Sequence, residues 1–88
     1  MIFAGNATSD QAEGRLEEGQ YQVGQRVFIR QNDGQWRHGL VAAFHLQAGV
    51  WRIYVDHEPN TSRHTSISTT WKRHVRSEEA YAAMCLAR

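Results

Sequence analysis

The stretch Val50-Trp51-Arg52-Ile53-Tyr54-Val55-Asp56 decides the fold of this 88-residue chain. Apolar side chains alternate with polar ones along it, and in a β-strand successive side chains point to opposite faces. Trp51, Ile53 and Val55 therefore share one face, and the even-numbered residues share the other. Because β-branched and aromatic residues favour strands, the stretch predicts a strand whose odd-numbered face is buried.

A long strand is expected to precede this stretch and to pair with it in a hairpin. Residues 36–46 are rich in apolar and aromatic side chains. Gln47-Ala48-Gly49 then supplies a turn, since glycine accepts a positive φ without steric cost. Gly39 lies inside the long strand, which is typical of a bulge or a sharp bend. We expect this bend to let one strand serve both sides of a small barrel.

Three further short strands complete the predicted sheet. Residues 27–30 alternate like the central strand and end before Asp33-Gly34, a strong turn signal. Residues 65–70 are rich in β-branched side chains and are predicted to form a strand around Ile67, and residues 74–76 form a last strand after a tight turn. This spacing predicts a mainly β fold, a small barrel of four to five strands. Its core is expected to contain Val27, Ile29, Val41, Phe44, Trp51, Ile53, Val55, Ile67 and Trp71.

The length allows one domain, which divides into three segments. Residues 1–20 are predicted to be a flexible acidic arm that does not join the core. Residues 21–76 form the barrel. Residues 77–88 form a short helix, because Ser77 is a good N-cap and two glutamates follow it. The helix is expected to dock on the barrel, or on a second copy of the chain, through Tyr81, Met84 and Cys85.

Charge is distributed unevenly along the chain. Residues 1–20 carry four acidic side chains against one basic, whereas residues 21–76 carry eight basic against three acidic. All five histidines also lie in the middle segment, so its positive charge rises below about pH 6.5. The sequence therefore predicts a basic barrel surface.

The sequence argues against several classes of site and location. The single cysteine, Cys85, excludes an internal disulfide, and its alanine-rich surroundings indicate a small buried hydrophobe rather than a nucleophile. The spacing of His45, His57 and His64 is not that of a metal site, and no phosphate-binding glycine loop or nucleophile elbow occurs. We expect no metal, no cofactor and no catalysis within one subunit.

No apolar run approaches the about 18 residues of a membrane span, and no secretory signal is evident. No membrane partner and a cytoplasmic location are therefore expected.

Several short motifs resemble the landmarks of Tudor-type domains, which are SH3-like barrels. The motifs are Val23-Gly24-Gln25-Arg26-Val27, Asp33-Gly34 with Trp36 and Gly39, Ile53-Tyr54-Val55-Asp56, and Trp71-Lys72. The resemblance implies an SH3/Tudor-like barrel over most of the middle segment.

The resemblance does not imply methyl-lysine reading. Tudor domains with that activity use an aromatic cage, because a methylated ammonium is attracted to several π faces. The usual cage positions fall on or near Gln31, Arg37 and Val55, and none of these is aromatic. Trp36 and Tyr54 lie one residue away, which in a strand is the opposite face.

A weaker resemblance is to the plasmid-borne type II dihydrofolate reductases, short SH3-like chains whose tetramer builds one active pore. They begin their barrel with a Gly-x-Arg-Val motif similar to residues 24–27, and they use a Val-Gln-Ile-Tyr segment. The corresponding residues 63–68 share Ile67 but lack the glutamine and tyrosine that would hold pterin and nicotinamide. An oligomeric reductase-like enzyme is therefore one alternative function.

The function predicted first is a small non-catalytic binding module. Phosphates of a nucleic-acid partner would meet its arginines and bases would stack on its exposed aromatic rings, and a protein partner is equally open. In another interpretation the basic face holds the acidic arm or keeps the protein soluble, and Phe28 and Tyr54 pack under the helix. Self-association is also open, since exposed aromatic residues require cover. The candidate partner-binding residues are Phe28, Arg30, Trp36, Arg37, Arg52 and Tyr54.

Overall fold

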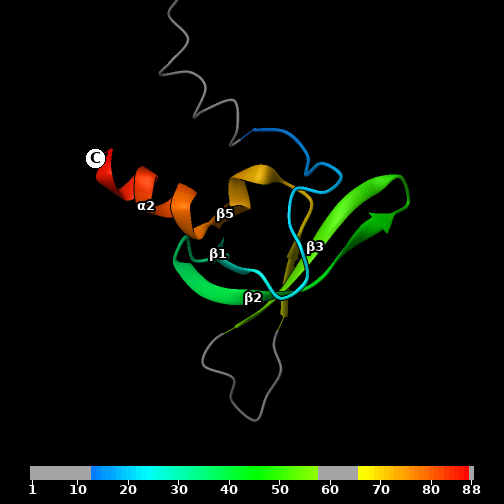
Figure 1. Cartoon of the computed structure of the whole chain (residues 1–88), viewed down its shortest axis with the longest axis horizontal. Helices are drawn as coiled ribbons and strands as arrows, with labels where there is room; N and C mark the ends of the chain where they lie inside the picture. The colour runs from blue at the N-terminus through cyan, green and yellow to red at the C-terminus, as the bar shows by residue number, and fades with distance from the viewer. Residues whose placement is uncertain (1–12, 58–65, 88) are drawn as a thin grey trace, which may run out of the picture.

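The computed structural model describes residues 13–57 and 66–87. It confirms the predicted mainly β fold, with five strands, a short 3-10 helix η1 and a C-terminal α-helix (Figure 1). The elements are β1 Arg26–Arg30, β2 Trp36–Gln47, β3 Val50–His57, β4 Ser66–Thr69, η1 Lys72–His74, β5 Val75–Ser77 and α2 Glu78–Leu86. The predicted loop at 58–62 lies outside the described residues.

The strands form one antiparallel sheet in the order β4-β3-β2-β1-β5. The last strand returns beside the first, so Val75 pairs with Ile29. In Figure 1, α2 lies at the β1–β5 end of the sheet, and the tip of the β2–β3 hairpin projects away from it. The sheet thus has a helix-covered end and a hairpin end.

The two predicted hairpin turns are confirmed. Asp33 accepts a hydrogen bond at Oδ1 from the Gln35 backbone amide at 2.9 Å, and Gly34 has φ 83°. In the β2–β3 turn Ala48 and Gly49 have φ 51° and 81°. Two successive positive φ values match the right-handed twist of the paired strands, which fixes the register of this hairpin.

The core confirms the predicted faces of β1 and β3. Val27, Ile29, Val41, Ile53 and Val55 are each no more than 2% exposed. The three partly buried residues Phe44, Trp51 and Ile67 pack against them. Trp71 was expected in the core, and this is wrong: it is half-buried at the end of the sheet, with arginine side chains over its ring.

The expectation that the acidic arm stays outside the core is wrong for its described part, residues 13–20. Leu16 is 3% exposed, and its backbone amide donates to the Thr70 carbonyl at 2.9 Å. Arg15 forms an isolated β-bridge with Trp71. The physical reason is that Leu16 removes its apolar surface from water against the end of the sheet. Residues 1–12 lie outside the described part.

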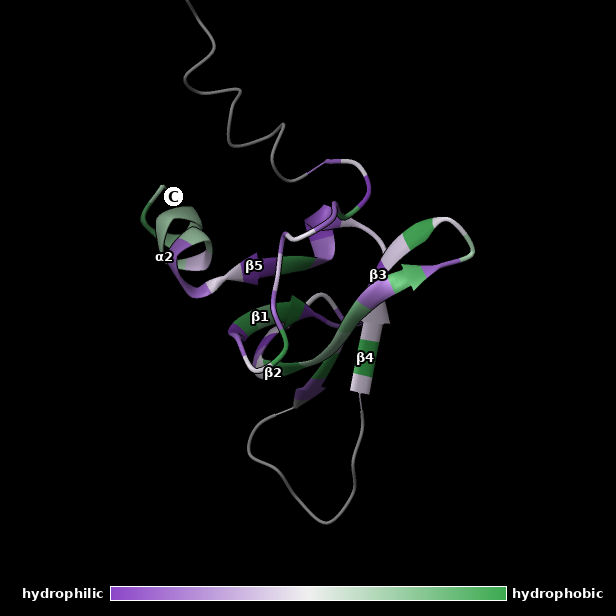
Figure 2. Cartoon of the chain, turned by 45° about the vertical axis from the view of Figure 1, so that its right-hand side comes forward, coloured by the Kyte–Doolittle hydropathy of each residue, from purple (hydrophilic) through white to green (hydrophobic). Residues whose placement is uncertain are grey.

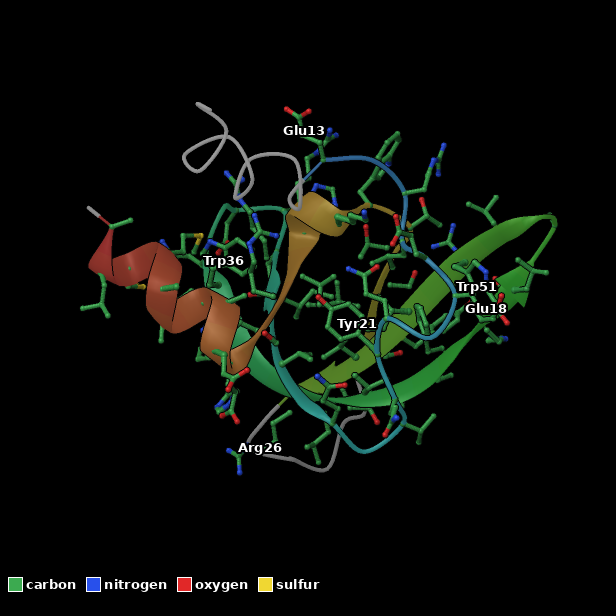
Figure 3. All side chains as sticks on the ribbon, turned by 45° about the horizontal axis from the view of Figure 1, so that its top comes forward. Glu13, Glu18, Tyr21, Arg26, Trp36 and Trp51 are labelled. Carbon is green, nitrogen blue, oxygen red and sulfur yellow. The ribbon has the colours of Figure 1, made fainter. Side chains whose placement is uncertain are left out.

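Tyr21 and Val75 are two more core residues that the expected list omitted. Tyr21 is 9% exposed and lies at the centre of the molecule in Figure 3. Its ring meets Phe44 edge-on with centroids 6.0 Å apart, and its hydroxyl donates to the Val75 carbonyl at 3.5 Å. Burial raises the pKa of this phenol, although the positive charge of Arg76 acts in the opposite direction.

The expected bulge at Gly39 is also wrong. Gly39 pairs regularly with Val27 and His57, and the register shift lies between Val41 and Ala43. A Cβ at position 39 would lie 2.6 Å from Cγ1 of Val55 and closer still to the Asp56 carbonyl oxygen. Glycine is therefore required here by the close approach of β3.

Helix α2 begins as predicted but docks through fewer residues than expected. Ser77 Oγ accepts from the Ala80 amide at 3.1 Å, which is the predicted N-cap. Tyr81 and Met84 are half-buried, whereas Cys85 is exposed, so its predicted burial is wrong. The helix contacts β1 through Glu78, which pairs with Arg26, and through Tyr81, which stacks on Phe28, and it also lies against β5. Figure 2 shows mixed colouring along α2 and stronger hydrophobic colouring on β1.

The two faces of β3 predict opposite effects of neighbouring substitutions. Ile53→Ala should lower the free energy of unfolding by about 2 to 5 kcal/mol, because it leaves a cavity in the core. Arg52→Ala is the control and should change it by less than about 1 kcal/mol, since it removes one hydrogen bond from a surface face. Urea unfolding of both variants checks this, and a larger loss for Arg52→Ala than for Ile53→Ala would mean that the faces are reversed.

Candidate functional site

A polar groove of about 550 Å³ lies between the β1–β2 turn and the segment from β4 to η1. Cavities of about 300 to 1,000 Å³ are typical of sites for small ligands. The groove is lined by Arg30, Gln31, Asn32, Gly34, Arg52, Ile67, Ser68, Thr69, Thr70, Trp71 and His74. We call it the basic groove, because its charged side chains are arginines and none of these lining residues is acidic.

Two arginines reach the basic groove from separate strands. Arg30 ends β1 on its outward face and is exposed. Within residues 13–57 and 66–87 its guanidinium group forms no hydrogen bond or ion pair. Arg52 lies on the outward face of β3, and its Nη1 donates to Ser68 Oγ at 2.9 Å. In the described part of the chain, the Ser68 hydroxyl is the one hydrogen-bond partner of the Arg52 guanidinium group. Both guanidinium groups thus lack a carboxylate partner there.

Two more arginines flank the groove at Trp71. The Arg15 guanidinium carbon lies 4.0 Å from the Trp71 ring centroid, and that of Arg73 lies 5.0 Å from it. Such contacts stabilise a cation by about 0.5 to 1 kcal/mol at exposed sites. Arg15 also donates from Nη1 to Thr70 Oγ1, which holds the arm beside the groove.

Two of the described carboxylates form ion pairs away from the groove. Glu78 on α2 forms an ion pair with Arg26 at 3.8 Å, and it is hydrogen-bonded to His38 at 2.8 Å. Glu17 pairs with Lys72 at 2.9 Å. Within the described residues, these two glutamates neutralise basic side chains at the helix-covered end and the arm, and the groove arginines form no ion pair. Asp33, which lies between the lining residues Asn32 and Gly34, accepts from the Gln35 amide instead.

The pKa of His74 is shifted by burial and by the arginines around the groove. Burial lowers the pKa of this imidazole, and the positive charges of Arg73, Arg30 and Arg76 lower it further. Its Nδ1 lies 3.0 Å from Thr69 Oγ1, which also accepts from the Trp71 amide at 3.1 Å. The Thr69 hydroxyl can both donate and accept, so the imidazole tautomer sets the direction of this hydrogen bond. In either tautomer the hydrogen bond holds the imidazole ring of His74 at the groove lining.

The hydroxyl–imidazole pair of Thr69 and His74 does not form a catalytic site. Thr69 is 7% exposed, and its oxygen is already used by the Trp71 amide. Nucleophilic catalysis requires an accessible oxygen whose base is oriented by a third group. In the described ranges, no three His, Cys, Asp or Glu side chains gather as metal ligands would. The pair instead positions the His74 ring.

The structure separates the six predicted partner-binding residues into three groups. Arg30 and Arg52 come together in the basic groove. Arg37 is exposed and its Nε donates to Oε1 of Gln31, a groove residue, so Arg37 lies at the edge.

Phe28 and Trp36 lie instead under α2. Phe28 stacks on His38 and on Tyr81, with ring centroids 4.4 and 3.9 Å apart. The ring centroid of Trp36 lies 5.7 Å from that of Tyr81, and Trp36 lies beside the helix in Figure 3. The interpretation in which Phe28 packs under the helix is therefore confirmed.

Tyr54 does not contact the helix. It is half-buried on the outward face of β3, where its hydroxyl donates to Gln47 Oε1 at 3.2 Å. Its ring lies 5.7 Å from His45, the cross-strand neighbour of Arg52. Tyr54 therefore continues the outward face of Arg52 beyond the groove.

Sequence reasoning missed four residues of the groove region: Arg15, Trp71, Arg73 and His74. Three of them follow β4 within five residues, where the short strand and the tight turn carry aromatic and basic side chains together. That clustering was a usable signal. Arg15 offered none, because its contact with Trp71 spans 56 positions of the sequence.

Comparison of the chain with known protein families, with curated proteins and with solved structures found no match. No helix within the described residues is long and apolar enough to cross a membrane.

The lowered pKa of His74 predicts a pH dependence of stability. Below about pH 6.5 the unfolded chain takes up a proton at His74 that the folded chain accepts only at lower pH, so the free energy of unfolding falls on acidification. The dependence ends below the folded pKa. The wild type should therefore lose more stability than His74→Gln between pH 7 and pH 5 in urea unfolding. An NMR titration that places the His74 pKa at or above 6.5 would contradict this.

Proposed function

We propose that the chain is a non-catalytic binding module of the SH3-like barrel type, and that its basic groove binds the anionic groups of a partner. The observation that carries the proposal is that Arg30 and Arg52 both line the basic groove, and that neither guanidinium group has a carboxylate partner within the described residues. Guanidinium groups are suited to phosphate and carboxylate, which they bind through two parallel hydrogen bonds.

The position of the arginines supports a binding role over a structural one. Like charges in the basic groove repel one another. The positive charges of Arg73 and Arg30 contribute, after burial, to the lowered pKa of His74 in this groove. A bound anion would remove this repulsion. A structural arginine would be expected to pair within the fold, as Arg26 does with Glu78 at 3.8 Å.

A methylated lysine is a poor ligand for this groove. Its ammonium is cationic and would be repelled by Arg30 and Arg52. Of the cage positions expected from the Tudor resemblance, Val55 is 0% exposed, and Arg37 is hydrogen-bonded to Gln31. The resemblance therefore supports the barrel, while the groove supports an anionic ligand.

Inorganic polyphosphate tests the anion site without assuming the nature of the partner. Arg30→Gln and Arg52→Gln should each weaken its binding about tenfold at low salt, because each removes a charge-assisted hydrogen bond. Arg26→Gln is the matched control: it makes the same charge change at the other end of β1, about 13 Å away along the strand. Isothermal titration calorimetry measures all four proteins. Equal weakening by all three variants would contradict a local site.

A further inference from the structure

We infer that the anionic partner is a single-stranded nucleic acid, whose phosphates lie in the basic groove and one of whose bases stacks on Tyr54. This inference rests on the proposed function, because it requires the groove to bind anions. It goes further in naming the polymer and in assigning Tyr54, which is not one of the groove-lining residues, as a second contact point.

The outward face of β3 places a cation beside an aromatic ring. Arg52 and Tyr54 are two residues apart on one strand, so they share a face and lie about 7 Å apart along it. One nucleotide spans this distance with its phosphate at the guanidinium and its base over the phenol. Combining a positive groove with aromatic platforms is how single strands are bound without sequence preference.

The neighbouring strands add groups of the same kind. His45 lies opposite Arg52 on β2 and is exposed, with its ring 5.7 Å from that of Tyr54. Ser68 lies opposite Tyr54 on β4, and its hydroxyl accepts from Arg52 at 2.9 Å. The surface from the groove to Tyr54 therefore presents a guanidinium, a hydroxyl and two flat rings. This basic and aromatic surface ends at Asp56, the next residue on this face of β3, which is acidic.

The Tyr54 ring is held in place before any ligand arrives. Its hydroxyl donates to Gln47 Oε1 at 3.2 Å, and Gln47 Nε2 lies 3.3 Å from His45 Nε2. A side chain already fixed by a hydrogen bond loses little conformational entropy when a base stacks on it. Phe28, the other ring predicted for stacking, is instead covered by Tyr81 at 3.9 Å.

The geometry favours a single strand over a duplex. Duplex DNA is read most often by an α-helix in the major groove, with basic side chains that reach base edges and phosphates. Helix α2, spanning Glu78–Leu86, has two glutamates in its first turn and no lysine or arginine. The arginines lie in a hollow of about 550 Å³, which a flexible backbone enters more readily than a rigid double helix does.

The number of arginines bounds the salt dependence. Arg30 and Arg52 lie in the groove, with Arg15 and Arg73 at its edge, so two to four phosphates are neutralised. For a single strand the slope of log K against log salt is about −0.7 per phosphate, which gives about −1.4 to −2.8 here. The expected affinity is modest, with a Kd of about 10⁻⁴ to 10⁻⁶ M at physiological salt.

The experiment measures fluorescence anisotropy of labelled oligo(dT) with the full chain at several salt concentrations. Tyr54→Ala should weaken binding about 5- to 150-fold, the loss of one stacked base, whereas Tyr54→Phe, which keeps the ring and loses only the hydrogen bond to Gln47, should weaken it much less. Arg30→Gln should weaken binding and reduce the salt slope by about 0.7. Circular dichroism checks that each variant is folded. Tyr54→Ala should leave polyphosphate binding unchanged, because polyphosphate has no base.

Three outcomes would overturn the inference while leaving the proposed function in place. One is oligo(dT) binding that depends on Arg30 but is equal in Tyr54→Ala and Tyr54→Phe. Another is tighter binding of a duplex of the same length than of oligo(dT). The third is binding of poly-glutamate as tight as that of oligo(dT), which would indicate an acidic protein partner. If neither polyphosphate nor oligo(dT) binding responds to Arg30→Gln and Arg52→Gln, the proposed function fails as well.

Discussion

Burial of alternate side chains on β1 and β3 is the constraint on which the rest of the structure depends. Val27 and Ile29 on β1 form one core with Ile53 and Val55 on β3. Because the side-chain period of a strand is two, this burial forces Arg52 and Tyr54 outward, and it leaves Arg30 exposed at the end of β1. The apolar core therefore also sets the positions of the cations. A shift of one residue in either strand would exchange the core for the binding surface.

Local pattern was sufficient to predict the five strands, both tight turns, the N-cap of α2 and most of the core, because each depends on neighbours in sequence. It failed where contacts are long-range. Tyr21 is buried against Phe44 and hydrogen-bonds to Val75, and Leu16 is held at Thr70. A single apolar residue between polar ones shows no periodicity, so its burial is decided by the apolar surface that the rest of the fold leaves uncovered.

The same limit applied to the candidate site. The outward direction of Arg30, Arg52, Phe28 and Tyr54 follows from strand alternation, but what covers each of them does not. Tyr81 stacks on Phe28, and this removes from the surface a ring that the sequence offered for stacking. The return of residues 70–74 beside the β1–β2 turn closes one side of the groove and brings His74 to Arg30. Juxtaposition of this kind depends on sheet topology, which residue spacing alone does not specify.

The chain contains three tryptophans, and each reports on a different part of the molecule. Trp71 lines the basic groove. Trp36 lies beside α2, and Trp51 packs against the core with its ring centroid 5.2 Å from that of Phe44 (Figure 3). An NMR titration of the indole N–H signals with polyphosphate and with oligo(dT) tests most directly that the groove is the binding site. The Trp71 signal should move with both ligands while the other two stay in place. Movement of the Trp36 signal with Trp71 unchanged would instead place the partner on the helix-covered end and contradict the account.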